Sequence, residues 1–271
     1  MLDNMIFEST KKKPSLCETI QSFTKKFPRL SRYKKLQDLD LCKMQEELKA
    51  PQQLDNYFNI IKEYLLENKK IFENEDKFIN DEKTMQIIYD KIYDYVMSKI
   101  YNKINTPETD NIDCKIFINC VKLSWTEPKN FMKDKKNFVY DSFLPEVIQY
   151  FKMIDIEKSP RKKLINMSNI YKSISNLVDF NNGEGKADIG VDDQMPILNY
   201  SFIKAQPERI YSNCRFMELY IGEKSCKEEG SQLSQLMGIC MYVKDISYNS
   251  LIDVTEEEFN LKCNQAAENQ I

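Results

Sequence analysis

The chain has 271 residues, and its 39 basic and 42 acidic residues give a formal net charge of −3, which provides no overall basic field for binding nucleic acid. It contains no histidine, which excludes histidine-activated nucleophiles, imidazole proton transfer and histidine-ligated zinc. Its eight cysteines form no C-x-x-C pair, and we expect them to be reduced thiols packed as small hydrophobic groups.

The start of the chain lacks the features of an export signal. Asp3 and Glu8 lie where a secretory signal needs an apolar centre. The longest uninterrupted stretch of apolar or small residues, 236–243, is far shorter than the roughly 20 residues that cross a bilayer. We therefore expect a cytoplasmic protein without a transmembrane segment.

Residues 11–37 are strongly basic, because they contain nine lysine or arginine residues and a single acid, Glu18. Such a region could attract anionic lipids by about 1 kcal/mol for each basic residue near the surface. The alternative is a solvated arm without a partner. We assign residues 1–35 to a basic N-terminal arm and keep weak peripheral membrane contact through residues 11–35 as an open alternative.

The distribution of glycine and proline favours long helices in the first two thirds of the chain. All six glycines lie between Gly183 and Gly238, so the preceding residues lack the usual residue for turns with positive φ. Several prolines fall between apolar periodic segments or at their starts, as is typical of helix boundaries. They are Pro51, Pro107, Pro128, Pro145 and Pro160.

The most regular helical pattern lies near residue 90. Apolar residues recur there every four positions, which predicts a long helix with a wide apolar face. These residues are Ile88, Ile92, Val96, Ile100 and Ile104, with Tyr89, Tyr93 and Tyr101 beside them.

Two further helices are predicted from capping residues. In "SPRKKL", Ser159 can cap the free amide groups and Pro160 suits the first helical position. In "VTEEEF", Thr255 can act as the cap, with Glu258 three residues later. Strand-like alternation is scarce and no repeat of fixed period occurs, so we predict an all-α fold of about ten helices.

The glycine-rich stretch before residue 191 is similar to two known kinds of loop but matches neither. "GEGK" lacks the earlier glycine and the following hydroxyl residue of a phosphate-binding loop, because Phe180 and Ala187 stand at those positions. No window in residues 179–193 places oxygen ligands and glycine as a calcium-binding loop requires. We therefore predict no metal site and no cofactor.

This loop leads Asp192 and Asp193 to the start of an apolar helix that should end before Pro207. Pro196 is expected within the first turn, where its missing amide costs little. A carboxylate at such a start is kept ionised by free amide groups and by the helix dipole. Position alone does not separate a structural cap from a functional acid. The expected buried face is Ile197, Leu198, Phe202 and Ile203.

Several motifs together resemble the VPS9 domain family over residues 89–259. The strongest are "VDDQMPIL" and "IKAQPERIYSN", and "KLSWTEP", "SPRKKL" and "SLIDVTEEEF" follow the family's order and spacing. Characterised members of this family are guanine-nucleotide exchange factors for Rab GTPases of the Rab5 group. The resemblance implies a layered all-helical domain braced by a preceding helical bundle. We accordingly assign residues 36–115 to the bundle and residues 116–265 to the VPS9-like domain.

The resemblance also implies a set of site residues. Asp192 stands at the position of the family's catalytic acid, four residues before the motif proline, Pro196. Ser231 and Ser234 stand where the family usually has a tyrosine and a threonine on a later helix. We expect Pro196, Ser231 and Ser234 at the GTPase-binding surface, with Asp193 in a supporting or solvent-facing place. The serine at 231 lacks the aromatic ring that would reach the partner.

Three functions remain for this chain. The leading hypothesis is an exchange factor that docks on a Rab5-like GTPase and acts in endocytosis and vesicle trafficking, with recruitment from the cytoplasm to endosomal membranes. The second is a catalytically weak or inactive binding module, because Ser231 replaces the family tyrosine. The third is a helical scaffold in which Asp192 only caps a helix. None of the three needs nucleic acid or a cofactor.

Overall fold

The computed structural model describes residues 50–67, 82–104, 109–132, 142–182, 191–221 and 227–269. All regular elements in these ranges are helices, which confirms the predicted all-α class. The basic arm at residues 1–35 and the glycine-rich loop at 183–190 lie outside the described residues. The chain divides into two compact units, Met1–Asn105 and Thr106–Ile271.

The first unit contains two described helices, α5 (Ala50–Glu67) and α7 (Glu82–Ile104), which pack against each other. An aromatic cluster joins them, and the rings of Phe58 and Tyr93 lie 4.5 Å apart between centroids. The predicted helix near residue 90 is confirmed, with Val96 and Ile100 in its buried face. The role of residues 36–115 as a brace for the second unit stays a prediction.

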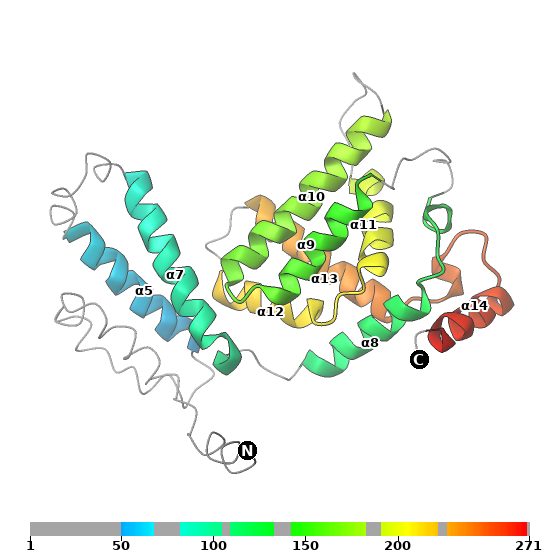
Figure 1. Ribbon diagram of the computed structural model, residues 1–271, viewed down its shortest axis with the longest axis horizontal. Helices are drawn as coiled ribbons and strands as arrows, with labels where there is room; N and C mark the ends of the chain where they lie inside the picture. Colours follow the sequence, from blue (N-terminus) through cyan, green and yellow to red (C-terminus); the bar gives the residue numbers. More distant parts are fainter. Residues whose placement is uncertain are drawn as a thin grey trace, which may run out of the picture. The chain divides into compact units, whose positions relative to one another are not determined.

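The second unit has helices that pack around one hydrophobic core (Figure 1). α9 and α10 run side by side, and α11, α12 and α13 pack against α10. Its elements are α8 (Asp110–Lys122), η3 (Pro128–Asn130), α9 (Leu144–Ile156), α10 (Pro160–Asn182), α11 (Val191–Ala205), α12 (Ile210–Tyr220), α13 (Lys227–Lys244), η5 (Tyr248–Ser250) and α14 (Glu256–Glu268).

The predicted helix starts at Pro160 and Thr255 are both confirmed. Pro160 is the first residue of α10. The Thr255 hydroxyl accepts a hydrogen bond of 3.2 Å from the amide of Glu258, and this bond caps α14. None of the described helices combines the length and the apolar character needed to cross a membrane.

α11 lies at the centre of the second unit, in contact with α8, α9, α10 and α13. All four residues of its predicted buried face are buried. The rings of Phe151 and Phe202 meet edge to face, with centroids 5.5 Å apart, and both side chains are 0% exposed. Such contacts fix the helix by close packing, because an interior of this density leaves no room for it to shift.

Replacing Phe151 with alanine should lower the free energy of unfolding of the second unit by about 3–5 kcal/mol, because the change removes buried ring contacts and leaves a cavity. Urea unfolding followed by circular dichroism would measure the loss. Phe180→Ala is the matched control, since that ring is 67% exposed. Equal losses in the two variants would contradict the central role of the Phe151 contact.

Candidate functional site

Both aspartates of the predicted site lie in the first turn of α11. The helix begins at Val191, so Asp192 and Asp193 are its second and third residues. Their side chains lie outside the described part of the chain. In this turn the free backbone amide groups and the positive end of the helix dipole favour an ionised carboxylate.

The prediction that Pro196 lies within the first helical turn is wrong. The helix starts at Val191, so the half-buried Pro196 lies inside it, beyond the first turn. Proline has no amide hydrogen, so position 196 donates no hydrogen bond to the carbonyl of Asp192, and its ring crowds that carbonyl. The residues before it can still be helical, because one lost bond does not outweigh the packing of the rest of α11. The backbone at Asp192 is therefore held less tightly by the helix ladder than the turns that follow.

The opposite end of α11 is fixed by polar contacts. The Lys204 ammonium group donates a hydrogen bond of 2.6 Å to the carbonyl of Ser124, in the turn after α8. It lies 5.3 Å from the centre of the Tyr200 ring, and burial lowers its pKa. Gln206 has a left-handed φ of 47°, and the helix ends before Pro207 as predicted.

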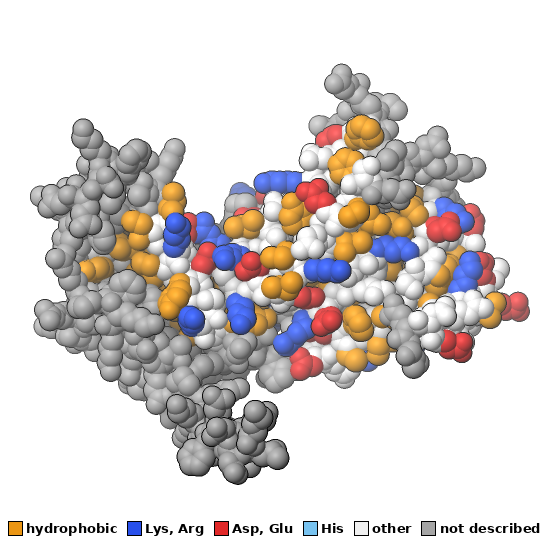
Figure 2. Space-filling model, viewed as in Figure 1, with side chains coloured by type: hydrophobic (Ala, Val, Ile, Leu, Met, Phe, Trp, Pro, Cys, Tyr) orange, Lys and Arg blue, Asp and Glu red, His pale blue; other side chains and the backbone are white. Residues whose placement is uncertain are grey.

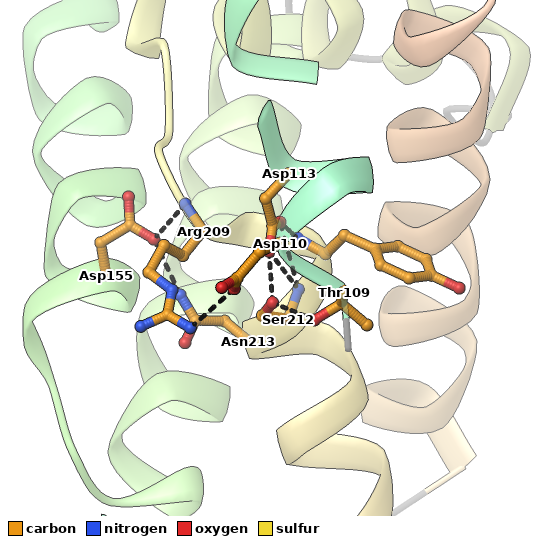
Figure 3. Close-up of polar contacts among 8 residues, drawn as sticks. Thr109, Asp110, Asp113, Asp155, Arg209, Ser212 and Asn213 are labelled. Atoms are coloured by element: carbon orange, nitrogen blue, oxygen red, sulfur yellow. Dashed lines mark hydrogen bonds and ion pairs between the residues drawn. The ribbon is translucent and has the colours of Figure 1, made fainter. Parts of the chain in front are cut away.

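The turn after α11 is held by carboxylates from two other helices (Figure 3). α12 begins at Ile210, and its N-cap residue Arg209 makes no side-chain capping bond. The free amide groups at a helix start need partners when they are buried. Here the partners are Asp113 of α8 and Asp155 of α9.

Asp113 accepts hydrogen bonds from the amide groups of Tyr211, at 2.8 Å, and Ser212, at 3.2 Å. The Ser212 hydroxyl donates a short bond to the same carboxylate and also contacts the Thr109 hydroxyl. Burial raises the pKa of Asp113, and the hydrogen bonds from Ser212 and Tyr211 oppose that rise. The bonds thus favour the ionised form that the helix start needs.

Asp155 caps the same turn from the other side. Its carboxylate accepts hydrogen bonds from the amide groups of Glu208, at 2.9 Å, and Arg209, at 3.3 Å. It also accepts one of 2.7 Å from the side-chain amide of Asn213. Burial raises its pKa, while the amide bonds and the nearby Lys163 lower it. Asn213 therefore braces the helix turn.

Lys163 lies beneath this turn with its side chain 0% exposed. Its ammonium group donates a hydrogen bond of 2.6 Å to the carbonyl of Ile154, near the end of α9. Burial lowers its pKa to about 8, and the negative charges of Asp155 and Glu157 oppose that shift. The buried Lys163 and the partly buried Asp155 thus lie together beside the start of α12.

Sequence reasoning did not single out Asp113 and Asp155, although a signal for them exists. Asp113 shares the buried face of α8 with Ile116 and Cys120, three and seven residues later. Asp155 follows Phe151 by one helical turn in α9. An acid on an apolar helix face indicates a buried partner, but the sequence does not show which helix supplies it.

Ser231 and Ser234 lie on α13, and both are exposed. The Ser234 hydroxyl donates a hydrogen bond of 3.0 Å to the carbonyl of Gly230, one turn earlier. The Ser231 hydroxyl accepts one of 3.5 Å from the side chain of Gln235. Both bonds stay within α13, so the two serines present short polar side chains at its surface.

The two faces of α13 differ sharply in side-chain size. Most of its apolar residues belong to the core, whereas Met241 is 38% exposed. On the outer face, a Cβ atom added at Gly238 would meet nothing within 4 Å. The buried residues are Leu233, Leu236, Ile239, Cys240 and Val243.

The second unit is an all-helical domain in which α11 and α13 pack on the same hydrophobic core. The first turn of α11 carries two aspartates, and the exposed face of α13 carries two serines. Residues 144–248 of this domain match the family model of the Vacuolar sorting protein 9 (VPS9) domain. The match begins with α9 and ends in η5, so it contains Asp192, Pro196, Ser231 and Ser234. The resemblance to the VPS9 domain family that the motifs indicate is thereby confirmed.

Known proteins are similar over a longer part of the chain. Vacuolar protein sorting-associated protein 9A of Arabidopsis thaliana is 25% identical over 183 residues, which are 65% of this chain and 35% of that protein. Rab5 GDP/GTP exchange factor of Homo sapiens is 24% identical over 181 residues, 64% of this chain and 36% of that protein. The chain thus spans about a third of the length of these relatives.

The buried Lys163 should make stability depend on pH in a way that a Lys163→Met variant lacks. Its pKa is about 8 in the folded chain and about 10.4 in an unfolded one. Between these values the unfolded chain binds more protons at this residue, so the lysine's contribution to stability rises with pH. The stability of Lys163→Met relative to the wild type should therefore fall by about 1.4 kcal/mol per pH unit above pH ~8.

Urea unfolding of both proteins at several pH values would measure that difference. The comparison is needed because burial also raises the pKa of the Cys120 and Cys240 thiols. Their contribution to the free energy of unfolding therefore falls with pH in the same range, and it cancels when the two proteins are compared. Lys162→Met, at an exposed position in the same turn of α10, is the control. A difference between wild type and Lys163→Met that stays constant with pH would contradict the assignment.

Proposed function

We propose that the chain is a guanine-nucleotide exchange factor for a Rab5-like small GTPase, with Asp192 as an acidic finger that displaces Mg²⁺ and GDP. The observation that carries the proposal is that Asp192 is the second residue of α11 inside the segment that matches the VPS9 domain. Relatives from two mammals are named Rab5 GDP/GTP exchange factors, which supports the choice of partner.

The proposed mechanism uses competition between anions. A small GTPase holds GDP through the lysine of its phosphate-binding loop and through Mg²⁺. A carboxylate brought into that site offers the lysine another negative partner and repels the β-phosphate. Mg²⁺ and GDP then leave, and GTP refills the site by mass action. The exchange factor needs no metal or cofactor of its own for this reaction.

The surroundings of α11 support such a role, because the helix that carries the finger must keep its position when Asp192 meets a phosphate site. The buried face of the helix is fixed by packing, as the contact between Phe151 and Phe202 illustrates. Its far end is fixed by the Lys204 hydrogen bond and by the capped turn that leads into α12. A helix held in this way loses little conformational freedom on binding, so less of the binding energy is spent on ordering it.

Binding to the GTPase must supply the energy for nucleotide release. An exchange factor shifts the equilibrium only by the difference between its affinities for the nucleotide-free and the loaded GTPase. In this proposal Ser231 and Ser234 of α13 belong to the docking surface together with Pro196, and Asp193 supports Asp192. The site of action is the endosomal membrane, as the family resemblance implies.

A second function is favoured by the short side chain at position 231. Ser231 is exposed and hydrogen-bonded only weakly within its own helix, at 3.5 Å. An aromatic ring at that place would add contact area on the partner, and aromatic residues often carry much of an interface's binding energy. Without it, the chain would be a VPS9-fold binding module with weak or no exchange activity. Such a module would bind nucleotide-free GTPase without accelerating GDP release.

Asp192→Ala should slow GDP release from a Rab5-like GTPase by about 100-fold or more relative to the wild-type chain, because the competing negative charge is lost. Release of fluorescent GDP under excess unlabelled nucleotide would measure the rate. Asp192→Asn should be nearly as slow, since it keeps the size of the side chain and removes its charge. Asp245→Asn, at an exposed acid after α13, is the control and should leave the rate unchanged. Equal acceleration by wild type and Asp192→Ala would remove Asp192 from the mechanism.

Ser231→Tyr should accelerate GDP release by up to about tenfold, because the ring would bury additional surface against the docked GTPase. The same release assay measures the effect, and binding to nucleotide-free GTPase should tighten in parallel. Asn176→Tyr places the same ring at an exposed position of α10, outside the proposed surface. If both tyrosines had the same effect, or neither had any, Ser231 would have no place in the docking surface.

A further inference from the structure

The corner between α9 and α10 exposes two large apolar side chains. Ile156, the last residue of α9, is 65% exposed, and Ile165, early in α10, is 51% exposed. Both helices bury their opposite faces, through Phe151 in α9 and Leu164 and Met167 in α10. The two isoleucines therefore contribute little to the core and leave apolar surface exposed at this corner.

Basic residues flank these isoleucines. Lys152 lies one helical turn before Ile156 on the same outer stripe of α9, because positions four apart share a helix face. On α10, Lys162 lies three residues before Ile165 and Lys172 seven residues after it, spacings that also share a helix face. Lys158 in the connecting turn and the half-exposed Arg161 complete the set.

Two acids lie near this corner and reduce its charge. Glu157 forms an ion pair of 3.8 Å with Lys162. Glu208 is exposed, and its backbone amide is bonded to Asp155. Asp155 is partly exposed and points into the capped turn of α12, where the nearby positive charge of the buried Lys163 offsets its negative charge. The outward balance stays positive, because the basic residues outnumber the two acids.

We propose that this basic corner, formed by Ile156, Ile165 and the surrounding lysine and arginine residues, binds the surface of an anionic lipid membrane. The combination suits that partner, since the isoleucines can enter the boundary between headgroups and acyl chains while the ammonium groups stay at headgroup level. Anionic lipids attract the basic side chains. Figure 2 shows lysine and arginine side chains interspersed with hydrophobic ones over the described surface.

The basic corner and the start of α11 lie toward opposite ends of α10 (Figure 1). α10 has 23 residues, so its ends are about 34 Å apart at 1.5 Å per residue. α11 contacts α10, and in Figure 1 it starts beside the half of α10 farther from the corner. A membrane at the corner would therefore lie away from the start of α11. The lipid proposal does not depend on the exchange proposal.

The test is sedimentation of the full chain with lipid vesicles, either of phosphatidylcholine with phosphatidylserine or of phosphatidylcholine alone. The wild type should bind the anionic vesicles, and added salt should weaken that binding. The double variant Ile156→Ser and Ile165→Ser should bind them about tenfold more weakly, because it removes two apolar side chains from the interface. Lys158→Glu with Lys162→Glu should show a similar loss.

Matched controls lie elsewhere on the second unit. Leu261→Ser changes an exposed apolar residue of α14, which is 59% exposed, and Lys115→Glu changes an exposed lysine of α8. Both should bind vesicles as the wild type does, and urea unfolding should show that every variant is folded. All proteins keep residues 11–35, so any contribution of the basic arm is common to them.

Three results would overturn the proposal. The wild type could fail to bind anionic vesicles, the corner variants could bind as tightly as the wild type, or binding could be equal on neutral vesicles. GDP release from a GTPase in solution should be unchanged in the corner variants. A lost lipid interaction and a lost exchange activity are therefore distinguished by separate measurements.

Discussion

The second unit depends on two carboxylates, one buried and one partly buried, that cap a helix to which neither belongs. The start of α12 needs acceptors for its free amide groups, and Arg209 at its N-cap position offers none from its side chain. Asp113 and Asp155 supply them from α8 and α9, far away in the sequence. Removing Asp113 would leave the buried amide group of Ser212 without that partner, which costs more than the net gain from forming such a bond. The capped turn therefore ties three helices together at one point.

This cap also holds α11, the helix whose first turn carries Asp192. α11 is held at its far end by the capped turn and Lys204, and along its length by the core. Its first turn has the weakest backbone support, because Pro196 donates no hydrogen bond to the carbonyl of Asp192. The helix is thus fixed everywhere except where an acid would have to adjust to a partner. Rigid support around a locally adaptable end suits a residue that must enter another protein's phosphate site.

The sequence predicted those features that depend on neighbours in the chain. Thr255 and Pro160 mark helix starts through local capping chemistry, and the buried face of α11 follows from periodicity. The capping roles of Asp113 and Asp155 could not be predicted, because their partners lie about 98 and 53 residues away and only tertiary packing brings them together. For the candidate site, the motifs predicted the helix that carries Asp192 but misplaced Pro196, since a single lost hydrogen bond did not prevent the helix from starting earlier.

The inner face of α13 stabilises the fold, and its outer face carries the residues that would decide the function. Its inner face, with Leu236 and Val243, is buried in the core, whereas Ser231, Ser234 and Gly238 face outward. A change at position 231 therefore alters the outer surface without disturbing the core, because exposed helix positions away from special contacts contribute little to stability. An active exchange factor and a weak binding module can consequently share this fold. The difference between them would reside in a few exposed atoms at position 231, which the core does not need for its packing.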